Sequence, residues 1–258
     1  MHASQRSCRT VLALACLLSP FTTGLAAPDT HAPAAKEAVP LDKAHPTALP
    51  RSFTFQYQVQ LGGVRGSGEL SWTRARDTYE ARLKGTVAGV AVVDWASSGG
   101  FDATGVAPSR YVEHRLAKSD RDVRFRKGES RISFSGSHSS DIPYVAGVQD
   151  RVSWLVQLPA IVAADPAKAR TGTRIALYVV GTRGRTGNWI FESAGRDNIH
   201  TPAGTVRAVK WTCNTGKGAE SQVEVWLDPE RHYLPARIRL TLTPPGVPLE
   251  MTLAEASP

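Results

Sequence analysis

The stretch FTFQYQVQL, residues 53–61, alternates apolar and polar side chains along its whole length. Every odd position from Phe53 to Leu61 is aromatic or aliphatic, and threonine or glutamine fills the positions between them. Because successive side chains of a β-strand point to opposite faces of a sheet, this pattern is typical of a strand with one buried and one solvated face. The stretch therefore predicts an antiparallel sheet with one apolar face.

Similar alternating segments follow along most of the chain, separated by turns that hold Gly, Pro or Asn. A second strand carries Leu70 and Trp72, and later segments lie at 79–87, 90–102, 109–116, 122–127, 131–135, 173–181, 187–193, 205–213, 222–228, 236–243 and 248–253. Short connections of this kind join antiparallel strands. About twelve strands are more than an open, twisted sheet usually carries flat. We therefore expect one large curved antiparallel sheet, a half-barrel or a barrel-like arrangement.

One segment, DRVSWLVQLPAIVAADP, interrupts the strand pattern. Asp150 is a candidate N-cap, and the apolar residues after it follow at helical spacing. Trp154 and Leu158 make the second side of this helix apolar too, so both sides require burial. The sequence thus predicts a mainly β fold in which the curved sheet wraps around one α-helix near residues 150–164.

The stretch VEVWLDPERHYLPARIRLTL, residues 223–242, predicts a hairpin with abrupt ends. Pro229 has no backbone N–H to donate to a neighbouring strand, so the first strand ends there. Pro235 stands at the head of the return strand, where a missing donor does least harm. Trp226 falls on the face opposite Val225, and we expect it to contribute packing rather than chemistry.

The N-terminal part of the chain predicts export. Residues 1–26 combine early arginines, a short apolar run and small residues before Ala26, as in a secretory signal peptide. Residues 27–50 are an Ala/Pro-rich segment without an apolar period, which predicts a disordered tether, and 51–258 are of a length that suits a single β-rich domain. A lipoprotein signal at Cys16 is the weaker alternative, because the apolar run before it is short and continues past it. We expect a periplasmic protein.

Charge gives a further expectation about partners. The formal net charge is +8 at pH 7, and a basic surface attracts anionic partners. For an exported protein these are lipid headgroups, lipopolysaccharide phosphates or acidic glycans, with peripheral contact to the membrane or the cell wall and no nucleic acid. A surplus of charge kept for solubility is the alternative. Cys213 is the one cysteine after the predicted cleavage, and its strand-like surroundings favour a buried thiol.

The final third of the chain resembles the domain of unknown function 3108 family of exported bacterial proteins. The matching positions form the patterns Thr-Pro-x-Gly-Thr, Trp-Leu-x-Pro and Tyr-Leu-Pro-x-Arg; they are Thr201, Pro202, Gly204, Thr205, Trp226, Leu227, Pro229, Tyr233, Leu234, Pro235 and Arg237. The resemblance implies a fold and a compartment, and no activity. A looser likeness of the hairpin to periplasmic lipoprotein carriers implies a half-barrel with an apolar cavity.

Catalytic and metal-binding patterns are missing from the sequence. The domain histidines His114, His138, His200 and His232 form neither H-x-H nor H-E-x-x-H, and Cys213 has no second cysteine at ligand spacing. No G-x-S-x-G nucleophile elbow occurs either. We therefore assign no catalytic residue, no metal ligand and no cofactor, while distant side chains that converge in the fold leave an enzyme open.

Aromatic and aliphatic side chains on the expected inner face are the candidate ligand-binding residues. They are Trp72 and Tyr79 from two strands, with Trp154, Leu155 and Leu158 from the helix. Ordinary core packing is the competing explanation for all five.

A basic group on the expected strands at 122–135 forms the candidate anion-binding residues. Arg124 and Arg126 share one strand face, and Arg131 follows on the next strand. Guanidinium groups suit phosphate or carboxylate, although a solvated outer face would carry the same residues.

Three functions follow from this pattern. The first is a non-enzymatic periplasmic protein that binds a lipid-like or amphipathic anionic envelope ligand in the concave face of the sheet. The second is an envelope interaction module with a filled core and no small-molecule ligand. The third is a hydrolase acting on envelope material. The sequence carries no signal for an oligomeric state.

The signal peptide yields a direct prediction. When the full chain is expressed in a bacterium and recovered from the periplasm, intact-mass spectrometry should give a mature chain that starts at Ala27 and carries no lipid. A mass that includes residues 1–26, or an acyl group on Cys16, would contradict this prediction.

Overall fold

The computed structural model describes residues 44–135, 140–214, 221–242 and 246–257. The chain forms two compact units, Met1–Glu37 and Ala38–Pro258, and every described residue lies in the second. The predicted signal peptide therefore lies outside the described residues.

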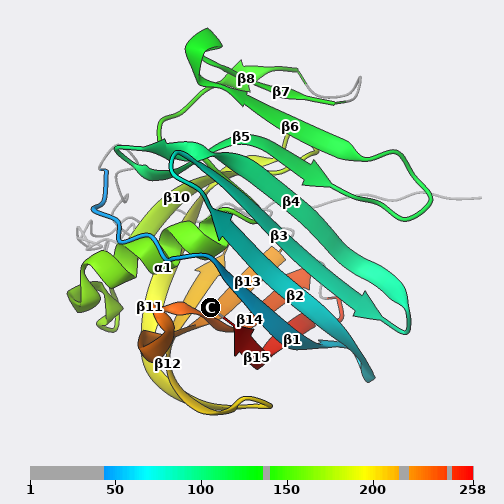
Figure 1. Cartoon of the computed structure of the whole chain (residues 1–258), viewed down its shortest axis with the longest axis vertical. Coiled ribbons are helices and arrows are strands. Elements are labelled where there is room, and N and C mark those ends of the chain that lie inside the picture. Colours follow the sequence, from blue (N-terminus) through cyan, green and yellow to red (C-terminus); the bar gives the residue numbers. More distant parts are fainter. Residues whose placement is uncertain (1–43, 136–139, 215–220, 243–245, 258) are drawn as a thin grey trace, which may run out of the picture. The chain divides into compact units, whose positions relative to one another are not determined.

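Fifteen strands of the described part form one sheet (Figure 1). They are β1 (Phe53–Leu61), β2 (Val64–Arg74), β3 (Thr78–Val87), β4 (Val90–Asp102), β5 (Gly105–Glu113), β6 (Arg121–Arg126), β7 (Arg131–Phe134), β8 (Ile142–Pro143), β9 (Gln149–Asp150), β10 (Arg174–Val180), β11 (Thr186–Thr201), β12 (Gly204–Asn214), β13 (Ser221–Asp228), β14 (Leu234–Leu242) and β15 (Leu249–Ser257). The predicted curved sheet around one helix is confirmed, and the expected number of about twelve strands was too low.

Neighbouring strands follow the order β8-β7-β6-β5-β4-β3-β2-β1-β15-β14-β13-β12-β11-β10-β9. The first and last strands of the domain, β1 and β15, thus pair in the middle of the sheet. All pairs are antiparallel except β9 with β10, which is parallel. Strands β8 and β9 stand at opposite ends of this order, so the ladder does not close into a barrel. The two-residue strands β8 and β9 were missed in the sequence because they are too short to carry an alternating pattern.

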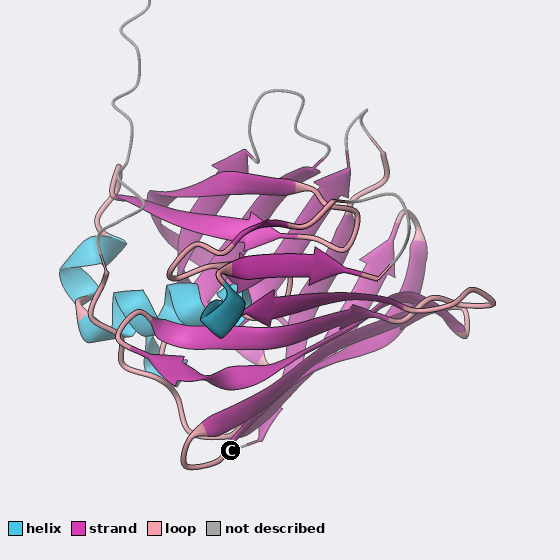
Figure 2. Ribbon diagram, turned by 90° about the horizontal axis from the view of Figure 1, so that it is seen from above, coloured by secondary structure: helices cyan, strands magenta, loops and turns pink. Residues whose placement is uncertain are grey.

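The helix α1 (Trp154–Ala164) lies between the two parts of the curved sheet (Figure 2). It packs against β5, against the neighbouring strands β9 and β10, and against β14. All its residues from Trp154 to Val162 are buried, as its two apolar sides predict. Three short 3-10 helices complete the description: η1 (Lys127–Glu129), η2 (Pro166–Ala169) and η3 (Pro229–Arg231).

The inner face of the sheet follows the alternation of the sequence. In β1, Phe53, Phe55, Tyr57 and Val59 are buried, and the residues between them are not. Trp72 and Tyr79, on adjacent strands, stack with their ring centroids 4.8 Å apart. These aromatic side chains form the core of the sheet rather than a surface.

The hairpin of β13 and β14 turns where the prolines predict. The carboxylate of Asp228 accepts a hydrogen bond from the backbone N–H of Glu230 at 2.9 Å, which fixes the start of η3. Trp226 is buried, donates its indole N–H to Asp197 at 2.7 Å, and lies beneath the charges of Lys210 and Arg237. Its contacts are structural, as expected.

Part of the segment predicted to be a tether packs on the domain. The backbone N–H of Ala48 donates to Ala160 O at 2.9 Å, and Leu49 packs against the core. The imidazole of His232 is hydrogen-bonded to Ala48 O at 2.6 Å. Residues 44–50 therefore run along the domain surface, and the rest of the predicted tether lies outside the described residues.

Buried polar side chains of the end strand β9 and of α1 are hydrogen-bonded to two inner strands of the ladder, and we call this region the seam. It joins Gln149, Asp150 and Gln157 to β4 and β5. The amide of Gln149 donates to Val106 O at 2.9 Å, and the backbone N–H of Val106 donates to the Gln157 side chain at 2.9 Å. Side-chain hydrogen bonds thus replace the backbone ladder that is missing there.

Gly105 makes the close approach of Gln157 feasible. Its φ of +105° is a conformation that residues with a Cβ rarely adopt, and a Cβ there would lie 2.5 Å from the Gln157 side-chain oxygen. A substitution at Gly105 would therefore open the seam.

Asp150 is the central residue of the seam. Its carboxylate accepts from Ser97 Oγ at 2.5 Å and from the backbone N–H groups of Val152 and Ser153 at 2.7 and 2.8 Å. It therefore caps the turn before α1 and ties that turn to β4. Because Asp150 caps this turn, the helix begins four residues later than the predicted position 150. Burial raises the pKa of Asp150 to about 6, although the hydrogen bonds from Ser97, Ser153 and Val152 lower it.

Asp150 predicts a pH dependence of stability with a defined sign. Its pKa lies near 3.9 in an unfolded chain and at about 6 in the fold, so the folded state holds more protons between these values. The contribution of Asp150 to the free energy of unfolding should therefore fall by roughly 2 kcal/mol as the pH rises from about 4 to about 6. Asp150→Asn should remove this fall, measured by urea unfolding at pH 4, 5, 6 and 7.

Asp102→Asn is the matched control. Partial burial raises the pKa of Asp102, but hydrogen bonds from Lys127 and Thr104 lower it overall, so its contribution has the opposite sign. An Asp150→Asn profile parallel to that of the wild type would show that Asp150 does not titrate in this range.

Candidate cavity between the sheet and the helix

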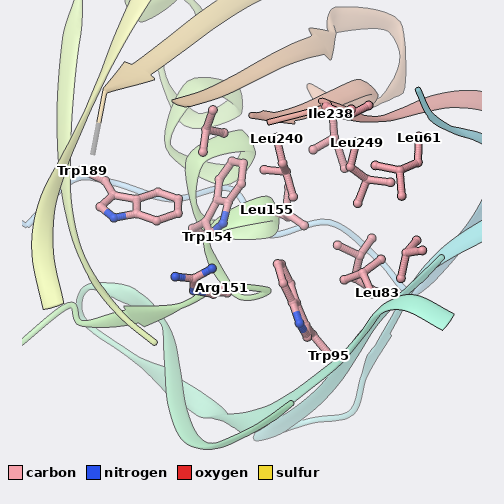
Figure 3. Close-up of a pocket in the computed structure, with 14 residues that line it drawn as sticks. Leu61, Leu83, Trp95, Arg151, Trp154, Leu155, Trp189, Ile238, Leu240 and Leu249 are labelled. Atoms are coloured by element: carbon pink, nitrogen blue, oxygen red, sulfur yellow. The ribbon is translucent and has the colours of Figure 1, made fainter. Parts of the chain in front are cut away.

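A cavity of about 330 Å³ lies between the inner face of the sheet and the start of α1 (Figure 3). Its lining is apolar with one exception, the guanidinium of Arg151. The lining residues are Leu61, Leu83, Val92, Val93, Trp95, Arg151, Trp154, Leu155, Trp189, Val223, Ile238, Leu240, Val247 and Leu249. The volume is at the lower end of the range for small-molecule sites.

The two sides of the cavity differ in chemistry (Figure 3). Trp95, Trp154, Trp189 and Arg151 gather on one side, and aliphatic residues that include Leu61 and Leu249 lie on the other. Trp154 is fixed in a cluster of rings, with its centroid 6.0 Å from Trp189 and 5.1 Å from Phe191. Trp154 and Trp189 are therefore packed in one ring cluster with Phe191.

The exposure of the aliphatic residues locates the mouth of the cavity. Val247 is 56% exposed, and Leu61, Val92 and Leu249 are half-buried. In contrast, Leu155 is buried in the interior. A ligand could thus enter past an aliphatic rim.

Arg151 comes from the turn that Asp150 caps, so the seam fixes its position. Its guanidinium lies over the ring of Trp95, 5.8 Å from the centroid. The backbone of Gly181 closes the other side, since a Cβ on Gly181 would lie only 2.9 Å from Arg151 Nε. A glycine at position 181 leaves room for this guanidinium.

The predicted ligand-binding residues divide into two groups. Trp154 and Leu155 line the cavity. Leu158 is fully buried on α1, and Trp72 and Tyr79 stack on each other in the core, so these three do not line it. The sequence pattern identified the inward direction of all five side chains but not which of them border open space.

The predicted anion-binding residues lie on β6 and β7, away from the cavity lining. Arg124 pairs with Asp122 at 3.2 Å, and Arg126 pairs with Glu129 at 2.9 Å. Arg131 pairs with Glu129 and with Asp141. Nearby carboxylates thus offset the charge of each guanidinium.

Trp95, Trp189 and Arg151 are cavity residues that the sequence reasoning missed. Both tryptophans lie within segments that were predicted as strands, so a search for inward aromatic residues could have included them. Arg151 carries a weaker signal. It directly follows the predicted cap Asp150 and precedes Trp154 in the sequence, which places a charge at the entry to an apolar helix.

The described residues offer little for catalysis or metal binding. Across 44–135, 140–214, 221–242 and 246–257, no three His, Cys, Asp or Glu side chains come together as a metal site. His114 is hydrogen-bonded to Asp120 and His200 to Thr205, whereas His138 lies outside the described residues. Cys213 is buried, and burial raises the pKa of its thiol to about 12.

Within the part of the chain that the structure describes, no helix has both the length and the apolar composition of a transmembrane span.

A family model described as "Protein of unknown function (DUF3108)" matches residues 56–254. The match spans most of the sheet and the whole of α1. Among curated proteins, none matches the sequence.

Three solved structures are similar to this chain. The β-barrel-like DUF1849 protein from Brucella abortus is 12% identical, with 81% of this chain and 98% of that chain covered, at a TM-score of 0.55. A Bacteroides fragilis protein with a YmcC-like fold is 11% identical, with coverages of 84% and 100% and a TM-score of 0.38. A chain of the Pseudomonas aeruginosa MucA/MucB complex is 12% identical, with coverages of 80% and 51% and a TM-score of 0.27. The first of these supports the β-barrel-like fold.

Proposed function

Because the chain belongs to the DUF3108 family of proteins of unknown function, we propose its function from the cavity: it is a non-enzymatic envelope protein that binds the apolar chain of a lipid-like ligand. The observation that carries this proposal is the apolar cavity of about 330 Å³ with three tryptophans in its wall. An open apolar space costs stability when it stays empty. Binding an apolar chain would offset that cost.

The size of the cavity fits one chain better than two. Burial of a methylene contributes about 0.8 kcal/mol, so a chain with about ten methylenes could supply roughly 8 kcal/mol before the costs of ordering. That free energy corresponds to a dissociation constant near 1 μM. Affinity of this size needs no polar contact at all.

The lining supports binding rather than catalysis. Among the described residues around the cavity, there is no Ser, Cys, His, Asp or Glu that could act as a nucleophile or a general base. The open volume next to Trp154 and Leu155 also favours a ligand over an interaction module with a filled core. A hydrolase has no supporting group at this site.

The proposed location is the periplasm, and the support for it is the signal-like pattern of residues 1–26. A binding protein in that compartment has access to lipids, lipopolysaccharide and amphipathic acids. The ligand we propose is accordingly an amphipathic molecule of the envelope.

The proposal predicts saturable binding of a neutral single-chain probe. Dodecanol should bind the full chain with a dissociation constant in the micromolar range, measured by isothermal titration calorimetry below the solubility limit. Leu249→Trp places a larger side chain at the half-buried rim of the cavity and should weaken binding at least tenfold.

Leu116→Trp is the matched control. Leu116 is 69% exposed and does not line the cavity, so the same substitution there should leave the affinity within twofold of the wild type. Absence of saturable binding to the wild type would remove the proposed function. Equal weakening by both variants would place the binding outside the cavity.

A further inference from the structure

Arg151 is a cation without a carboxylate partner in an apolar cavity. Within the described part of the chain it forms no ion pair and no hydrogen bond, and its one specific contact is the ring of Trp95. A charged group at the border of an apolar space is costly unless it is paired or hydrated. The charge of Arg151 is therefore available for a ligand.

The adjacent carboxylates have other partners. One carboxylate oxygen of Asp150 accepts a hydrogen bond from Ser97, and the other accepts from two backbone N–H groups of the turn before α1. Glu113 accepts a hydrogen bond from Thr182 Oγ1, which lies in the loop after β10. Neither carboxylate is within ion-pair distance of Arg151 in the structure.

We propose that Arg151 binds the headgroup of a single-chain carboxylic acid, whose chain lies along the apolar wall of the cavity. This inference rests on the proposed function and names the ligand class for it. Figure 3 shows the arrangement that carries it, with Arg151 between Trp154 and Trp95 and the aliphatic residues on the far side.

The charge count favours a carboxylate over a phosphate monoester. Arg151 is the one Lys or Arg among the described lining residues, and a single guanidinium matches one negative charge with two parallel hydrogen bonds. A phosphate monoester carries between one and two negative charges at neutral pH, so part of its charge would stay uncompensated. A ligand with two acyl chains would need more volume than the cavity offers.

Calorimetric titrations of the full chain with dodecanoate, dodecanol and dodecyl phosphate test this assignment. Arg151→Gln should weaken dodecanoate binding by about 10- to 100-fold, because a hydrogen-bonded charge pair is lost. The same variant should leave dodecanol within twofold, and the wild type should bind dodecanoate more tightly than dodecyl phosphate. Arg151→Lys should fall between the wild type and Arg151→Gln.

Arg124→Gln is the control for the change in net charge, because it removes an outer arginine that is paired with Asp122. This variant should change neither the affinity for dodecanoate nor the affinity for dodecanol.

Different results would overturn the proposed function and the assignment of Arg151 to the headgroup. If neither dodecanoate nor dodecanol bound the wild type, the proposed function itself would be wrong. If dodecanol bound and Arg151→Gln left dodecanoate unchanged, or weakened both probes equally, the headgroup assignment alone would be overturned. Tighter binding of dodecyl phosphate than of dodecanoate would overturn the carboxylate class.

Discussion

The buried hydrogen bonds of Asp150 are the constraint on which the rest of the domain depends. Fifteen strands in one order leave two ends that do not pair with each other, and an unpaired ladder would expose backbone groups in the interior. Asp150 and Gln149 join one of those ends, β9, to β4 and β5 through side chains, and Gln157 of α1 is hydrogen-bonded to β5 as well. The start of α1 follows from this seam, because Asp150 caps the turn before the helix and ties it to β4.

The seam also explains why the apolar cavity has a charged residue at its border. The turn that Asp150 caps leads directly into α1, so the residue inside that turn, Arg151, is held at the border of the cavity. Trp95 on one side and Gly181 on the other leave the guanidinium little freedom. A preorganised cation next to an aromatic wall is what selective binding of an amphipathic acid requires.

Local patterns predicted the elements well and the cavity poorly. Strict alternation located β1 at its observed bounds, and the two-sided apolar helix was found because its composition excludes an exposed face. The strand predicted at 187–193 ends too early, because β11 continues to Thr201. A register shift between Ser193 and Gly195 interrupts the alternation of the side chains, so the sequence pattern stopped there. Trp72 and Trp154 carry the same inward signal, yet only Trp154 borders open space. That difference depends on how α1 and strands distant in the sequence come together around the cavity, which no short window of sequence encodes.

The most direct test of the account is the response of the six tryptophan indole N–H signals in a nitrogen–proton correlation spectrum. On saturation with a single-chain acid, the signals of Trp95, Trp154 and Trp189 should shift, because these three line the cavity. Those of Trp72, Trp211 and Trp226 should stay in place, because these residues belong to the core or the outer face. Shifts confined to the second group, or no shifts at saturating ligand, would contradict the account.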